Sequence, residues 1–249
     1  MTHTQTFNDW ITCPKPNPQA KLRLFCFPYA GGAAWNFRTW HSNLPTNVEV
    51  CALELPGRGT RILSSPFTRM ELLVKAIAIA LQPYLDKPFA FFGHSMGALV
   101  SFEVSRFLRR EWGIFPVHLF VSGRRAPQIP NSHAPIYDLQ ETEFLEKLRA
   151  FNGTPAEVLE HKELMELMIP ILRADFAVLE TYLYTPEPPL ACPIAVFGGL
   201  QDRDVSGIEL EAWREQTHDS FQLQMFPGDH FFLHSARSLL LQSLAQQIS

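Results

Sequence analysis

The chain has few charged residues and no cluster of basic ones. Asp, Glu, Lys and Arg make up 18% of its 249 residues, and the formal net charge is −4; an average soluble protein has about 25% charged residues. Nucleic-acid-binding proteins neutralise phosphates with clustered Lys and Arg. The two adjacent arginine pairs, Arg109–Arg110 and Arg124–Arg125, are too small for that. We therefore expect no nucleic-acid partner.

Cysteine is also scarce, and long apolar runs are missing. Cys13, Cys26, Cys51 and Cys192 lack the spacing of metal ligands, so we expect free thiols in a reducing compartment. No apolar run reaches the ~18 residues of a membrane span. The N-terminal residues lack the basic and apolar regions of a secretory signal. We expect a cytoplasmic protein without membrane association.

Short apolar runs alternate with helical stretches along the chain. The pattern predicts strands at 22–27, 48–53, 89–93, 118–122, 193–197 and 221–226, and helices at 70–84, 96–112, 208–216 and 235–248. Such alternation indicates an α/β fold with a mostly parallel central sheet flanked by helices. The proline-rich stretch 13–18 is expected to be an extended arm. The length agrees with one domain over residues 1–249.

Residues 93–97, with the sequence GHSMG, form the most specific local motif. An apolar strand precedes them and an amphipathic helix follows. Gly93 and Gly97 lack the β-carbons that would collide in a sharp strand-to-helix turn, so Ser95 can hold a strained backbone with its hydroxyl projecting outward. The amide of Met96 at the helix N-terminus can donate to an oxyanion. We predict that Ser95 is a nucleophile and that Met96 helps to stabilise the oxyanion.

A serine nucleophile needs a base and an acid, and both follow later in the chain. Asp202 comes after one predicted strand and His230 after the next. The order Ser, Asp, His is that of the α/β-hydrolases. His230 is predicted to take the proton of Ser95 while Asp202 orients its imidazole. Two rivals are Asp204, which lies further from the strand end, and His234, which three apolar residues separate from the loop.

Two further ionisable residues precede Ser95 and His230 directly in the sequence. His94 is next to the nucleophile, but its side chain is expected to point away and to give packing or indirect support. Asp229 precedes His230, and a carboxylate there would tend to raise the imidazole pKa if it lay close.

Six stretches of the sequence carry a family resemblance. They are residues 24–32 (LFCFPYAGG), 55–58 (LPGR), 93–97 (GHSMG), 122–127 (SGRRAP), 172–176 (LRADF) and 230–233 (HFFL). Together they resemble the type II thioesterases, the stand-alone editing hydrolases of polyketide synthases and non-ribosomal peptide synthetases. The resemblance covers nearly the whole chain. It implies an α/β-hydrolase fold, a triad of Ser95, Asp202 and His230, oxyanion donors at the backbone N–H groups of Ala30 and Met96, and no metal or other cofactor.

The resemblance also implies a substrate. It would be an acyl chain on the phosphopantetheine arm of an acyl or peptidyl carrier protein, removed when it is stalled or mis-primed. One of the arginine pairs could meet such an acidic carrier. Two alternatives stay open: a medium-chain fatty acyl thioesterase or general esterase on the same scaffold, and a non-catalytic protein that binds acyl carriers. The complete triad argues against the second.

Residues 128–190 interrupt the alternation of strands and helices. This interval has helical segments at 141–151 and 163–181 but no clear strand. We predict that it is a helical lid above Ser95 that could shape an acyl channel. Its apolar residues either line that channel or only pack together. They are Leu159, Leu164, Met165, Leu167, Met168, Ile171 and Leu172.

Overall fold

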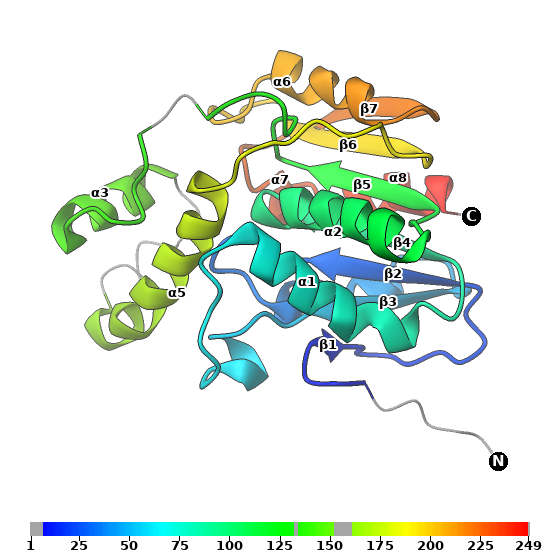
Figure 1. Ribbon diagram of the computed structural model, residues 1–249, viewed down its shortest axis with the longest axis horizontal. Helices are drawn as coiled ribbons and strands as arrows, with labels where there is room; N and C mark the ends of the chain where they lie inside the picture. Colours follow the sequence, from blue (N-terminus) through cyan, green and yellow to red (C-terminus); the bar gives the residue numbers. More distant parts are fainter. Residues whose placement is uncertain (1–6, 132–133, 152–160, 249) are drawn as a thin grey trace.

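A seven-stranded sheet runs through the centre of the molecule (Figure 1). The structure, a computed structural model, describes residues 7–131, 134–151 and 161–248. The strands are β1 (Ile11–Thr12), β2 (Leu22–Phe27), β3 (Val48–Leu53), β4 (Phe89–His94), β5 (His118–Ser122), β6 (Ile194–Gly199) and β7 (Phe221–Phe226). Their order across the sheet is β1-β3-β2-β4-β5-β6-β7. β1 is antiparallel to β3, and all the other neighbours are parallel.

Helices lie on both faces of this sheet and beyond the carboxyl ends of its strands (Figure 1). They are α1 (Met70–Leu81), α2 (Met96–Trp112), α3 (Glu141–Phe151), α5 (Lys162–Glu180), α6 (Gly207–Glu211), α7 (Phe232–Ser235) and α8 (Arg237–Gln247). Short 3-10 helices occupy Ala34–Phe37, Trp40–Ser42, Gly59–Arg61, Gln82–Tyr84 and Ala212–Gln216. Figure 1 shows α1 and α2 in front of the sheet and α7 and α8 behind it. None of the helices in the described ranges is long and apolar enough to cross a membrane.

The apolar runs form strands because both faces of the sheet are buried. Every residue of β4 is buried. Successive side chains of a strand point to opposite faces, so Phe91 packs in the apolar core with Leu99 of α2, whereas Phe92 packs in the second core with Leu240 of α8. Cys26 and Cys51 are buried, and all four cysteines are free thiols.

The predicted strands and the helices that flank the sheet are confirmed, with their ends within three residues. The predicted helices at 70–84 and 208–216 each finish as a 3-10 helix, and the last one is divided into α7 and α8. β1 was not predicted, because two residues are too few for a pattern. It pairs with Leu53 and Ala52 at the edge of the sheet, and Ile11 is buried in the apolar core.

In the interval 128–190, the described residues form α3 and α5 and no strand. These two helices share an apolar cluster that includes Phe144, Leu148, Met165 and Leu172. In Figure 1 they lie on the side toward which the arrows of the parallel strands point. Leu159 of the predicted apolar set lies outside the described residues. A covering role for this insertion remains a prediction.

Candidate active site

Ser95 lies between the end of β4 and the start of α2. Its φ of +52° is the only positive φ at a non-glycine residue in the described ranges. A β-carbon on Gly93 would lie 2.2 Å from the Gly97 carbonyl oxygen, and one on Gly97 would lie 2.1 Å from the Phe27 carbonyl oxygen. Neither position can carry a side chain without moving the backbone. The structure therefore has the sharp strand-to-helix turn that the sequence predicts.

His230 and Asp202 are hydrogen-bonded to each other. Asp202 follows β6, His230 follows β7, and Nδ1 of His230 lies 2.8 Å from Oδ2 of Asp202. The other carboxylate oxygen accepts from the amides of Asp204 (2.8 Å) and Val205 (3.2 Å). Because a carboxylate can only accept, the proton is assigned to Nδ1 of His230, which leaves Nε2 as an acceptor.

The two rival residues have other contacts. The hydroxyl of Tyr29 lies 3.0 Å from Nε2 of His234, and burial together with nearby Arg237 lowers the pKa of His234. Asp204 meets Asp202 through its amide and not through its carboxylate. The geometry thus pairs His230 with Asp202. Asp229, whose effect on His230 was in question, accepts from the amide of Phe231 (2.9 Å).

His94 is fully buried behind the pair. Its Nδ1 lies 2.9 Å from Oγ of Ser122, and its ring centroid is 5.2 Å from that of His230. Burial, with a smaller contribution from His230, holds the pKa of His94 well below its ordinary value. A neutral imidazole packed against His230 fits the supporting role expected from the sequence.

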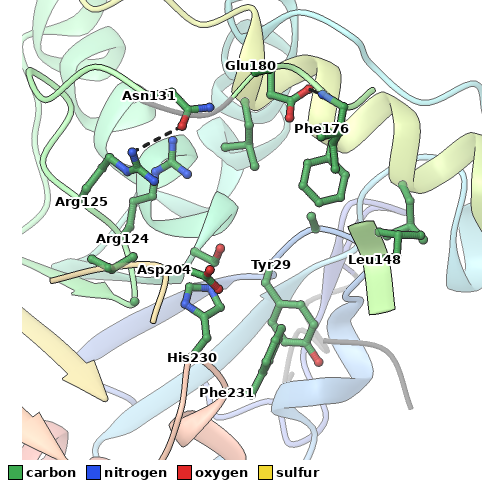
Figure 2. A pocket seen from close by; sticks show the side chains of 18 residues that line it. Tyr29, Arg124, Arg125, Asn131, Leu148, Phe176, Glu180, Asp204, His230 and Phe231 are labelled. Atoms are coloured by element: carbon green, nitrogen blue, oxygen red, sulfur yellow. Dashed lines mark hydrogen bonds between the residues drawn. The ribbon is translucent and has the colours of Figure 1, made fainter. Parts of the chain in front are cut away.

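Ser95 and His230 line one cavity of about 160 Å³. Figure 2 shows His230 beside Asp204, with Tyr29 and Phe231 close by. Further lining residues come from the loop after β5 and from the helices of the insertion. The apolar ones include Ile136, Leu148, Leu172, Phe176 and Leu179, and the polar ones are Arg124, Arg125, Asn131 and Glu180. The lining of the cavity is therefore mainly apolar, but it includes two arginines and Glu180.

Most of the apolar set predicted for an acyl channel does not line this cavity. Leu172 does, whereas Met165 is buried between α3 and α5. Leu164 and Leu167 are exposed. Leu148 of α3 contributes to the cavity, although the sequence analysis did not select it.

Two backbone amides near Ser95 have no acceptor within the described residues. They are those of Ala30, which lines the cavity, and Met96, the first residue of α2. The next amides of the loop after β2 are used: Gly31 donates to Asp175 (2.8 Å) and Gly32 to the Tyr29 carbonyl (2.8 Å). The two predicted oxyanion donors are thus available to a ligand.

The two arginine pairs, one of which was expected to meet an acidic carrier, lie in different surroundings. Arg109 and Arg110 both contact Glu187. Arg124 and Arg125 line the cavity, and Arg125 reaches Asn131 at 3.4 Å (Figure 2). Burial and the neighbouring Arg125 lower the pKa of Arg124 to about 10, so it is still cationic at neutral pH. The second pair therefore adds positive charge to the cavity.

One buried ion pair was not predicted at all. Arg58, in the loop after β3, binds Asp175 of α5 through both carboxylate oxygens. Both residues lie in stretches that carried the family resemblance, and that was their only signal in the sequence. A local pattern cannot show a contact between residues 117 positions apart.

Three residues of the site, Asp202, Asp204 and His230, are of types that can bind a metal ion. Each offers one ligand atom, and these atoms lie within 4.8 Å of one another. A cation held by Nδ1 of His230 and Oδ2 of Asp202 would have to displace their 2.8 Å hydrogen bond. The described geometry is that of an oriented imidazole.

The strand order, with a serine mounted between β4 and α2, defines an α/β-hydrolase fold. The family profile of the thioesterase domain matches residues 22–248. The chain belongs to the thioesterase family, whose members hydrolyse thioesters.

Individual relatives agree with this assignment. The gramicidin S biosynthesis protein GrsT of Aneurinibacillus migulanus is 46% identical over 248 residues, which cover 100% of this chain and 97% of GrsT. The medium-chain S-acyl fatty acid synthase thioesterase of Rattus norvegicus is 33% identical, over 90% of this chain and 86% of that protein. The solved type II thioesterase BorB from the borrelidin biosynthetic cluster has a TM-score of 0.89 and 33% identity, with coverage of 98% of this chain and 100% of BorB.

Proposed function

We propose that this enzyme removes aberrant or stalled acyl groups from the phosphopantetheine arm of acyl or peptidyl carrier proteins in polyketide or non-ribosomal peptide biosynthesis. Similarity to GrsT over the whole chain is the observation that carries the proposal. The similarity to BorB supports the same class of substrate. A cavity that joins Ser95 to a hydrogen-bonded His230–Asp202 pair supports the chemistry.

Acylation begins at Ser95. Its Oγ attacks the thioester carbonyl carbon, while Nε2 of His230 takes the hydroxyl proton. The carbonyl oxygen becomes an oxyanion, which accepts from the amides of Ala30 and Met96. The C–S bond then breaks, and His230 returns the proton to the leaving thiol of the pantetheine arm. An acyl ester of Ser95 remains.

Deacylation repeats the sequence with water. His230 takes a proton from a water molecule as its oxygen attacks the ester carbonyl, and the same two amides hold the second oxyanion. The bond to Oγ of Ser95 breaks, and His230 returns the proton to the serine. The free carboxylic acid leaves. Asp202 stabilises the imidazolium in both halves, and no step requires a metal or redox cofactor.

The cavity beside Ser95 is large enough to hold a short acyl group. An engineered protein cavity of about 150 Å³ holds benzene, and the cavity beside Ser95 is about 160 Å³. An acyl group of roughly six carbons or fewer would fill it. A medium-chain fatty acyl thioesterase is the second candidate, because the rat enzyme of that name is similar over most of its length.

The test compares substrates that carry the same short acyl group. Purified protein is incubated with an acyl-loaded carrier protein, with the acyl-coenzyme A and with a simple ester, and acyl loss is followed by intact-mass spectrometry. We expect release to prefer the carrier and to persist in EDTA. Preference for free acyl-coenzyme A or esters would support a general hydrolase. The same three substrates loaded with a medium-chain acyl group test the second candidate, which faster release of that longer chain would support. Carrier binding without release would contradict the proposal in favour of a non-catalytic protein.

A further inference from the structure

The buried pair of Arg58 and Asp175 has no part in the mechanism above. Both side chains are almost fully buried, at 6% and 5% exposure. Nη1 and Nη2 of Arg58 each lie 2.7 Å from a different oxygen of Asp175. Bidentate pairs of this kind fix geometry as well as charge. Burying two charged side chains costs desolvation free energy. Because the pair lies close to the cavity, we expect it to have a specific role.

The pair grips the loop that carries Ala30. Oδ2 of Asp175 accepts from the amide of Gly31 at 2.8 Å. Nη1 of Arg58 donates to the carbonyl of Gly32 at 3.1 Å. The ion pair therefore binds the two residues that directly follow the proposed oxyanion donor. The Gly31 N–H belongs to the peptide unit next to the one that carries the Ala30 N–H, so these contacts restrain the direction of the Ala30 amide.

The same loop is packed tightly on α5. Gly31 has a φ of +73°, and a β-carbon there would lie 2.7 Å from Cδ2 of Leu172. Leu172 and Phe176 line the cavity, and Asp175 lies between them on the same helix. One helix thus shapes the acyl chamber and holds the loop of the oxyanion donor.

We infer that Arg58 and Asp175 are positioning residues, which aim the Ala30 amide at the oxyanion by clamping the Gly31–Gly32 segment to α5. The inference rests on the proposed function of Ser95 and Ala30. The pair itself does not touch the substrate. It acts in the transition state, because only there does the carbonyl oxygen carry the charge that the Ala30 amide stabilises.

The principal variant is Asp175→Asn. An amide side chain has one acceptor oxygen, and its NH₂ group would face the Arg58 guanidinium, so the clamp cannot form with both oxygens. Loss of one oxyanion donor costs about 10²–10³ in kcat. A misdirected donor is expected to lower kcat by roughly 10- to 10³-fold, with KM changed by less than about threefold.

Two inhibitors separate positioning from general structural damage. The first inhibitor is an acyl trifluoromethyl ketone. Oγ of Ser95 adds to its carbonyl carbon, the serine proton moves to His230, and the former carbonyl oxygen becomes an oxyanion on the adduct. The matching pantetheine thioether, with CH₂ in place of the carbonyl, fills the pocket without an oxyanion. Asp175→Asn should weaken binding of the ketone by about the same factor by which it lowers kcat/KM. Binding of the thioether should weaken by less than about threefold.

A second buried pair supplies the matched control. Arg23 and Glu49 are 0% and 1% exposed, and Nε of Arg23 lies 2.6 Å from Oε2 of Glu49. They are paired at the amino ends of β2 and β3, the edge of the sheet opposite Ser95. Glu49→Gln should lower the melting temperature but leave kcat and both inhibition constants within about twofold.

If Asp175→Asn does not fold, Arg58→Lys replaces it. The ammonium keeps the buried charge but cannot hold both carboxylate oxygens together with the Gly32 carbonyl, so a smaller loss with the same pattern is expected. Equal weakening of ketone and thioether, or an unchanged kcat, would overturn the inference. Failure of the wild type to release acyl groups from a carrier would instead count against the proposed function, since the inhibitor comparison needs only Ser95.

Discussion

At the scale of single residues, the backbone of Ser95 is held in a conformation that costs about 1–3 kcal/mol for a residue with a side chain. The contacts that hold it are specific. Its amide donates to the Ser122 carbonyl at 2.7 Å, and the flanking glycines let the carbonyl of Phe27 and the start of α2 approach closely. This strain is tolerated at a position where the hydroxyl faces a cavity, as expected for a nucleophile.

The choice between two acids gives a prediction at this scale. Asp202→Asn should lower kcat by about 10³–10⁴, because the amide stabilises the wrong tautomer of His230. Asp204→Asn keeps the backbone N–H that donates to Asp202, so kcat of this variant should fall by less than about tenfold. Steady-state kinetics on an acyl thioester measure both. Equal, small losses would rule out Asp202 as the acid.

The site residues differ in how far the sequence could predict them. Ser95, Asp202 and His230 each follow a strand that the sequence predicts, so the parallel sheet brings them to one edge. The contact between Arg58 and Asp175 depends on how α5 docks, which no local pattern encodes. Residue-type patterns therefore select the three triad candidates and the neighbouring His94, but they do not reveal the Arg58–Asp175 pair.

At the scale of elements, α5 has an apolar surface wider than one stripe. Its bounds, Lys162–Glu180, agree with the predicted helix at 163–181. The sequence could not predict which apolar residues line the cavity. Periodicity identifies the apolar side of a helix but not the elements that this side contacts. Leu172 faces the cavity and Met165 faces α3.

A second prediction concerns the wall that α3 supplies. Leu148 is 4% exposed and lines the cavity. Leu148→Ala should enlarge the chamber and shift the preference in kcat/KM toward longer chains, by roughly 3- to 30-fold for two extra carbons, since a methylene in an apolar pocket is worth about 1 kcal/mol. A chain-length series from two to ten carbons measures this.

Leu145→Ala is the matched control for that experiment. Leu145 lies on the same helix and packs against the same apolar cluster, but it does not line the cavity. Its chain-length profile should match the wild type. If both variants shifted the profile equally, the assigned chamber wall would be wrong.

In the molecule as a whole, the candidate active site and His118 lie at opposite edges of the sheet. The site lies at the carboxyl edge of the strands. At the amino edge, His118 begins β5 and stacks on Phe120 with ring centroids 4.0 Å apart. Burial lowers the pKa of His118 to about 4, with a partial opposing effect from Asp219. Stability, unlike catalysis, should respond to this group.

The sign of that response follows from proton binding. An unfolded histidine has a pKa of about 6.5, whereas His118 in the folded protein has a pKa of about 4. Between these two pH values the unfolded chain binds a proton at His118 and the folded chain does not. Folding stability therefore falls as the pH drops from 6.5 to 4. The contribution of His118 at pH 5 is a loss of up to about 2 kcal/mol.

Urea unfolding at pH 7 and pH 5 checks this expectation. His118→Gln should lose less stability between the two values than the wild type does, whereas His218→Gln, at an exposed position, should lose as much as the wild type. If His118→Gln lost as much unfolding free energy between pH 7 and pH 5 as the wild type, His118 would not be the group responsible.

Ser95 is expected to carry the acyl group during turnover. The most direct measurement is rapid acid quenching of the enzyme mixed with an excess of acyl-loaded carrier, followed by intact and peptide mass spectrometry of both proteins. We predict one acyl increment on the peptide that contains Ser95 and loss of the acyl group from the carrier, with neither event in Ser95→Ala. Release of the acyl group by Ser95→Ala at the wild-type rate would contradict the account.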